Sequence, residues 1–211
     1  MYKIILILIA LAGNITLKAQ YPGYLPVADP AKFKTVFATA TKNANSIKSD
    51  FVQVKNLKMI SEKITSKGKF WFKKESQVRM EYNEPFQYLM ILNKDKVFVK
   101  DGQKENKINV RSNKLFQQIN KIMIDCMQGT TLDNPDFNTK VFENKNTALV
   151  ELTPVVKNLQ KLFKAITVVV DKKDYSVISI EMLERSGDNT IIRFTNKELN
   201  ATIPDALFTI K

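Results

Sequence analysis

Two pairs of carboxylates have a spacing that could support acid–base chemistry. Glu81 is followed by Glu84, and Asp171 by Asp174. Two neighbouring carboxylates can act as general acid and general base. Glu81, however, falls on the polar side of an alternating strand pattern, and the run from Asp171 to Asp174 is typical of a hairpin turn. We therefore predict that both pairs are solvated structural residues.

Missing residue types exclude several classes of enzyme. The sequence has no histidine and only six glycines, and no phosphate-binding glycine loop is present. Without histidine, neither a Ser-His or Cys-His nucleophile nor a His-containing zinc site can form. Cys126 is the single cysteine, so an internal disulfide is excluded. We predict a non-enzymatic protein that uses no cofactor and no metal.

Residues 1–19 have the pattern of a cleavable secretory signal peptide. Lys3 supplies the positive charge and residues 4–12 form an apolar run of nine residues. A membrane-spanning helix needs about 20 residues, so an uncleaved anchor is the weaker interpretation. Cleavage after Ala19 would leave residues 20–211 as one domain, with no cysteine near its start to carry a lipid anchor. We expect an exported, soluble protein.

The chain is strongly basic, with 33 Lys and Arg against 21 Asp and Glu and a net charge of +12. Loss of Lys3 and Lys18 with the signal peptide would leave 31 basic residues and a net charge of about +10. A basic surface can meet nucleic acid, an anionic membrane or an acidic partner. Because export removes most nucleic-acid partners, we expect none. A membrane surface, an acidic partner and a merely solvated surface remain open.

A helix and a series of strands are predicted for the first half of the domain. Asp29 is a helix N-cap, and Pro30 occupies the first helical position. From residue 47 to residue 111 the hydrophobic period changes to two, which is typical of half-buried antiparallel strands. Turns are predicted at 67–68, 83–85, 93–96 and 101–102. The predicted apolar face of the helix comprises Phe33, Val36, Phe37, Ala40, Ala44 and Ile47.

A second helix interrupts the strands, with its N-cap at Ser112 and its end before Gly129. Strands resume at 139–142, 148–153, 166–171, 177–184 and 190–197, with a short helix near 156–161. About eleven antiparallel strands form a sheet too long to stay flat, so twist should curl it toward an incomplete barrel. We predict a mainly β (α+β) fold with helices over the concave apolar face.

Alternation and helical period place one set of apolar side chains in a shared interior. Such an interior either packs as a plain core or holds an apolar guest. Both interpretations fit the composition of the set. The residues are Ile47, Phe51, Phe70, Phe72, Val78, Met80, Tyr82, Met90, Leu115, Phe116, Ile119 and Met123.

The chain contains SDFVQ at 49–53, GKFWFKK at 68–74, RMEYNEP at 79–85 and the ending IPDALFT at 203–209. The first three segments, taken in order, resemble the periplasmic outer-membrane lipoprotein carrier family, LolA, and the ending is similar to the family's last strand. The resemblance implies a periplasmic monomer with a helical lid over a cavity for lipoprotein acyl chains, lined by the interior set. It also implies an inner-membrane lipoprotein-release complex as donor and an outer-membrane acceptor. The alternative is a binding module or sensor for another envelope lipid or glycolipid.

The sequence departs from the family pattern at positions near the lid. Lys74 stands where the family has an arginine that latches the lid, and lysine lacks the planar fork of donors. Glu75 replaces a proline, and Val78 and Met80 replace aromatic residues. The resemblance implies that Lys74 is a lid latch that donates to helix-end acceptors, and a solvated strand-end lysine is the alternative.

Overall fold

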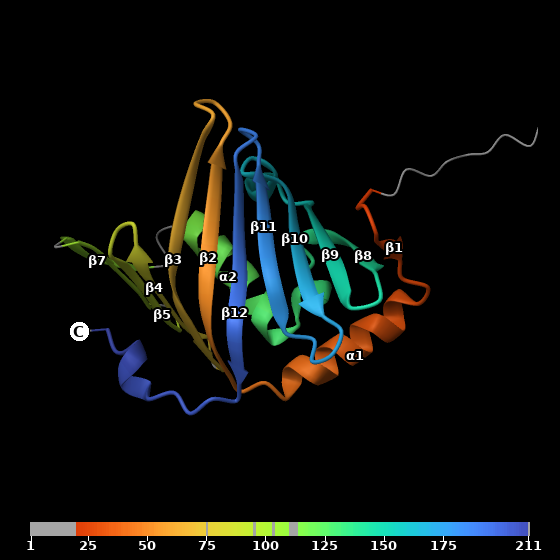
Figure 1. Ribbon diagram of the computed structural model, residues 1–211, viewed down its shortest axis with the longest axis horizontal. Helices are drawn as coiled ribbons and strands as arrows, with labels where there is room; N and C mark the ends of the chain where they lie inside the picture. Colours follow the sequence, from red (N-terminus) through yellow and green to blue (C-terminus); the bar gives the residue numbers. More distant parts are fainter. Residues whose placement is uncertain (1–19, 75, 95, 103, 110–113, 211) are drawn as a thin grey trace, which may run out of the picture.

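A computed structural model describes residues 20–74, 76–94, 96–102, 104–109 and 114–210, without the side chains of 104–109 and 114–120. The predicted signal peptide and the predicted cap at Ser112 lie outside these residues. Within them, twelve strands form one sheet (Figure 1). The strands are β1 (Leu25–Pro26), β2 (Ser46–Leu57), β3 (Glu62–Lys73), β4 (Gln77–Glu84), β5 (Tyr88–Asn93), β6 (Lys96–Asp101), β7 (Lys104–Asn109), β8 (Phe137–Glu143), β9 (Thr147–Pro154), β10 (Phe163–Asp171), β11 (Val177–Glu184) and β12 (Asn189–Leu199).

The sheet consists of two meanders joined at one seam. The strand order is β1-β8-β9-β10-β11-β12-β2-β3-β4-β5-β6-β7. Every neighbouring pair is antiparallel, and the seam between β12 and β2 places Phe194 opposite Phe51. The outer strands β1 and β7 stay apart, so the curved sheet is open (Figure 1). This confirms the predicted mainly β fold.

Two long helices pack against the concave side of this sheet. In Figure 1, α1 (Pro30–Lys42) follows its lower edge and α2 (Lys114–Gln128) lies behind its strands. The predicted start of α1 is confirmed, because the Asp29 carboxylate accepts a hydrogen bond from the Lys32 amide at 2.9 Å. Shorter helical segments are η2 (Thr131–Asp133), α3 (Lys157–Gln160) and η3 (Asp205–Phe208).

The predicted apolar face of α1 was too long and too broad. The helix ends at Lys42, so Ala44 follows it and Ile47 lies in β2. Val36 is 37% exposed, and the buried residues of α1 are Phe33, Phe37 and Thr41. These three follow the i, i+4 row of the helix. The contact with the sheet is therefore a narrow stripe.

The predicted turn at 67–68 was also wrong. The turn between β2 and β3 occupies residues 58–61, and Gly68 lies inside β3. A Cβ atom at Gly68 would lie 2.1 Å from the carbonyl oxygen of Glu81 and 2.8 Å from the ring of Phe51. Glycine is required here because strand β4 and an aromatic ring approach the backbone closely.

The C-terminal segment crosses the opposite face of the sheet. Ile203 and Phe208 are buried there against Ile91 of β5. The Arg79 guanidinium donates to the Leu207 carbonyl at 3.1 Å, and the Asn93 amide donates to the Phe208 carbonyl at 3.1 Å. The ending 203–209, compared above with a final strand, contains the 3-10 helix η3 instead. The C-terminal segment consequently covers this face of the sheet around Trp71 of β3 and Ile91 of β5.

The close approach at Gly68 predicts a large effect of a single methyl group. Gly68→Ala should lower the free energy of unfolding by about 2 kcal/mol, because the added Cβ must displace a backbone carbonyl and the Phe51 ring. Urea denaturation would measure this loss. Ser66→Ala in the same strand is the control and should change stability little. Equal stability of Gly68→Ala and the parent would contradict the close packing of β3 on β4.

Candidate functional site

Nine residues of the predicted interior set meet on the concave side of the sheet. Phe70 and Phe72 are fully buried there, whereas Trp71 between them packs on the opposite face. The strand register is thus the one that alternation predicted. The side chains of Leu115, Phe116 and Ile119 lie outside the described residues. The set that the structure brings together is Ile47, Phe51, Phe70, Phe72, Val78, Met80, Met90 and Met123, with Tyr82 partly buried against them.

The two long helices close over this set and contact each other. Phe33 and Phe37 of α1 enter the interior with their rings stacked 5.9 Å apart. At Gly129, which follows α2 with a φ of 73°, a Cβ atom would lie 1.9 Å from the hydroxyl of Thr41 in α1. The end of α2 therefore packs directly on α1. We call these two helices the lid.

Lys74, directly after β3, contacts the end of the lid. Its ammonium group donates a hydrogen bond to the carbonyl of Lys42, the last residue of α1. Its backbone amide donates to the carbonyl of Asn45 at 2.9 Å. The last carbonyls of a helix have no partner within the helix, so Lys74 satisfies one of them. This is the kind of acceptor expected for a lid latch.

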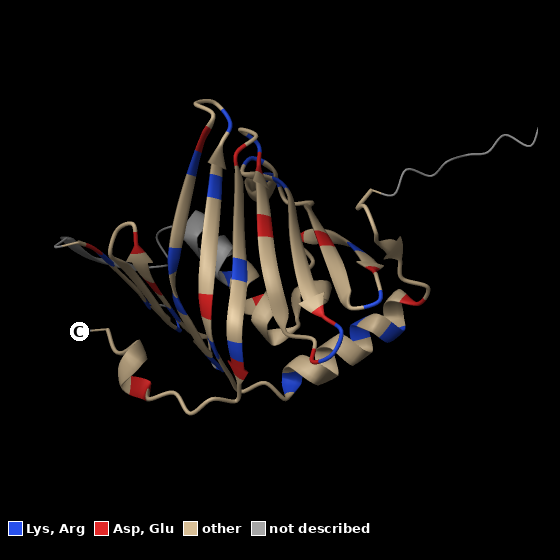
Figure 2. Cartoon of the chain, viewed as in Figure 1, with Lys and Arg blue, Asp and Glu red and all other residues tan. Residues whose placement is uncertain are grey.

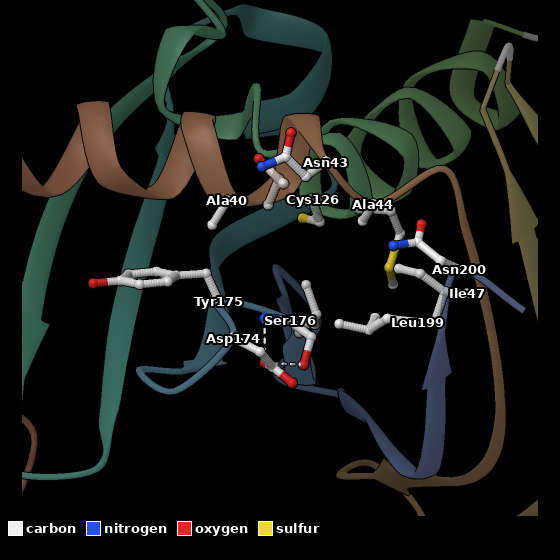
Figure 3. A pocket seen from close by; sticks show the side chains of 13 residues that line it. Ala40, Asn43, Ala44, Ile47, Cys126, Asp174, Tyr175, Ser176, Leu199 and Asn200 are labelled. Carbon is white, nitrogen blue, oxygen red and sulfur yellow. Dashed lines mark hydrogen bonds between the residues drawn. The ribbon is translucent and has the colours of Figure 1, made fainter.

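A pocket of about 130 Å³ lies where the lid joins the sheet (Figure 3). Ala40 and Ala44 line one side, and Tyr175 and Leu199 line another. The buried thiol of Cys126 also lines it. Burial raises the pKa of Cys126 to about 12. The thiol is therefore protonated and enclosed beneath the lid.

The same pocket has a polar side that the sequence analysis did not identify. The Asp174 carboxylate accepts hydrogen bonds from the Ser176 amide at 2.8 Å and from its hydroxyl at 2.6 Å. Lys197 of β12 donates to the Ser176 hydroxyl. Burial lowers the pKa of Lys197, and Asp174 and Asp171 oppose that shift. Asp174 and Ser176 meet within one turn, but Lys197 reaches them through the pairing of β11 with β12, so no local pattern could have indicated its contact.

A larger groove of about 550 Å³ lies at the other end of α1. Pro30, Ala31 and Lys34 of α1 form one wall, and Val141 and Phe142 of β8 belong to the opposite wall. The narrow α1 stripe thus leaves openings at both ends of the helix, along the line where the lid meets the sheet.

The carboxylate pairs have structural partners, as predicted. Glu81 accepts from Arg79 at 2.8 Å, and Glu84 pairs with Lys67 at 3.0 Å. Asp171 accepts from the amide of Lys173 at 2.9 Å within its turn. Within the described ranges, no group of three or more His, Cys, Asp or Glu residues is placed to hold a metal ion. In that same part of the chain, no helix has the length and apolar composition needed to cross a membrane.

Solved structures with a similar fold have little sequence in common with this chain. The MucA/MucB complex of Pseudomonas aeruginosa matches with a TM-score of 0.51 and 11% identity, over 85% of this chain and 60% of that one. An uncharacterized conserved protein from Thermus thermophilus matches with a TM-score of 0.51 and 7% identity, over 87% and 95%. A LolA superfamily protein from Nitrosomonas europaea gives a TM-score of 0.45 and 9% identity, over 87% and 99%.

Sequence comparison gives the family. Comparison with curated proteins finds no match. The family model described as outer membrane lipoprotein carrier protein LolA matches residues 42–211. That match includes the sheet from β2 onward, α2 and the C-terminal segment, with Lys74 inside it. The chain therefore belongs to the outer membrane lipoprotein carrier protein LolA family.

Proposed function

We propose that this chain is a periplasmic carrier, soluble after signal-peptide cleavage, that binds lipoprotein acyl chains beneath its lid. It would move them from the inner to the outer membrane. The observation that carries the proposal is the narrow contact of α1 with a concave apolar sheet face. Phe33 and Phe37 supply its large apolar side chains, and Lys74 attaches its C-terminal end. Family membership supports the same function.

The proposed mechanism exchanges one apolar contact for another. With the lid closed, Phe70, Phe72 and their neighbours pack against lid side chains. When α1 lifts, an acyl chain can take the place of those side chains, and each buried CH₂ contributes about 0.8 kcal/mol. Because the lid contacts must be given up first, net affinity stays moderate and release remains possible. Transfer would be driven by differences in affinity between donor, carrier and acceptor, without covalent catalysis.

The partners of such a carrier would be an inner-membrane lipoprotein-release complex and an outer-membrane acceptor. Lysine and arginine positions are spread along the strands and helices (Figure 2), and the whole chain has a net charge of +12. A charged surface accelerates encounter with a partner of opposite sign. We propose that acidic docking surfaces on the two partners are recognised in this way.

The identity of the bound lipid tests this function most simply. Protein purified from its native envelope without detergent should carry lipoprotein, detected by native mass spectrometry as a mass added to the chain. Phospholipid or glycolipid in place of lipoprotein would support the alternative of a different lipid-binding module or sensor. Protein that neither retains nor takes up any acylated molecule would contradict the carrier proposal.

The latch role of Lys74 predicts a change in lid opening. Lys74→Met removes the hydrogen bond to the Lys42 carbonyl and keeps the length of the side chain. A net hydrogen bond contributes about 1 kcal/mol, which corresponds to a roughly fivefold larger open population. Alkylation of Cys126 by iodoacetamide and uptake of a fluorescent fatty acid should both become about fivefold faster.

Lys69→Met is a suitable control for this variant. Lys69 lies in β3, five residues before Lys74, faces the other side of the sheet and pairs with Asp50 at 3.3 Å, with both side chains exposed. Lys73 is less suitable because it pairs with Asp205 of the C-terminal segment. If Lys74→Met and Lys69→Met alkylate at the parent rate, with equal thermal stability in all three proteins, Lys74 does not restrain the lid.

A further inference from the structure

The hairpin of β2 and β3 projects beyond the neighbouring strands (Figure 1). Apolar side chains at its tip are exposed. Met59 is 92% exposed, Ile60 57% and Ile64 42%. Single exposed apolar residues are ordinary on a protein surface. Here three exposed apolar residues occur within six positions of a protruding hairpin. Such a local group of exposed apolar side chains is typical of an interaction site. We call residues 58–64 the hairpin tip.

The neighbouring turn between β11 and β12 holds the hairpin tip in place. The Lys58 amide donates to the Asp188 carboxylate at 2.9 Å. The aliphatic part of Lys58 packs on Gly187, where a Cβ atom would lie 2.8 Å from the Lys58 Cδ. Ser61 has a φ of 55°, in the left-handed region. This turn geometry leaves Met59 and Ile60 directed into solvent.

Lysines flank the apolar residues of the hairpin tip. Lys58 and Lys63 are exposed within it, and Lys55 lies just below. Acidic neighbours are Glu62 in the tip, Asp188, which accepts from the Lys58 amide, and Glu184, which pairs with Lys55 at 3.7 Å. Figure 2 shows basic positions on both strands near this turn. Apolar side chains that enter the headgroup region, beside ammonium groups that meet lipid phosphates, fit an anionic membrane surface.

We propose that the hairpin tip docks this protein on an anionic lipid bilayer. Strand β2 begins at Ser46, next to the end of α1, and its far end leads into the tip. The tip and the Lys74 contact therefore lie at opposite ends of the hairpin, and docking leaves the lid free to open. The proposal deepens the carrier function by naming the membrane as a direct partner, although membrane binding itself does not depend on acyl-chain uptake.

Vesicle flotation tests this docking. Vesicles of phosphatidylglycerol and phosphatidylcholine should bind the parent, and vesicles of phosphatidylcholine alone should bind it less. Met59→Ser/Ile60→Ser should lower the partition coefficient about tenfold through lost apolar burial. Lys58→Gln/Lys63→Gln should lower the partition coefficient on the anionic vesicles alone. High salt should also weaken binding of the parent to the anionic vesicles. Leu25→Ser, at a residue 71% exposed and distant from the tip, is the control and should bind like the parent.

Equal binding by the parent and the Met59→Ser/Ile60→Ser variant would overturn the proposal. A concentration-dependent dimer that this variant abolishes, with no vesicle binding by the parent, would also overturn it and identify a second copy as the partner. Uptake of a fluorescent fatty acid in vesicle-free solution should be the same in the parent and the tip variants. Vesicle binding without any uptake would overturn the carrier function and leave the docking intact.

Discussion

The antiparallel pairing of β12 with β2 determines the shape of this protein. It joins two meanders that are distant in sequence, with Phe194 opposite Phe51. Because side chains alternate along each strand, this register brings Phe51, Phe70 and Phe194 to the same face. The rings of Phe70 and Phe194 lie 5.1 Å apart. A sheet of this length curls, and its concave apolar face must be covered, so the lid is a consequence of the seam.

The lid contributes little to the hydrogen bonding of the sheet. Each strand of the concave wall is paired with other strands, while α1 adds Phe33, Phe37 and the contact with Lys74. Burial of a large apolar side chain contributes roughly 1.5–3 kcal/mol. The backbone pairing of the sheet therefore does not depend on α1. This arrangement fits the proposed reversible binding of acyl chains beneath the lid.

Much of the wall could be predicted from alternation alone. Phe70, Trp71 and Phe72 alternate in and out as their sequence indicates, and the start of α1 followed from Asp29 and Pro30. Gly68 was misread because a glycine that permits close approach has the same local pattern as one in a turn. A glycine in a turn and a glycine at a close contact look the same in the sequence. Only the position of the neighbouring strand β4 shows which of the two Gly68 is.

Features that depend on distant contacts could not be predicted. The Lys197 contact with Ser176 requires the pairing of β11 with β12. Met59 is exposed because it lies in the hairpin turn between β2 and β3. The sequence analysis placed this turn at 67–68, so it did not predict that exposure. The acceptor of Lys74 belongs to a helix more than thirty residues earlier in the chain. In each case, local sequence shows which side chains are available, and the sheet register decides which of them meet.

Photo-crosslinking with a fatty acid that carries a diazirine at its terminal carbon tests the central claim most directly. Peptide mass spectrometry would locate the label. Binding beneath the lid predicts adducts on concave residues such as Phe70, Phe72 and Met80, which are buried under the lid side chains. Adducts confined to the opposite face, at Trp71 or Ile91, would place the acyl chain outside the curved sheet and contradict the claim.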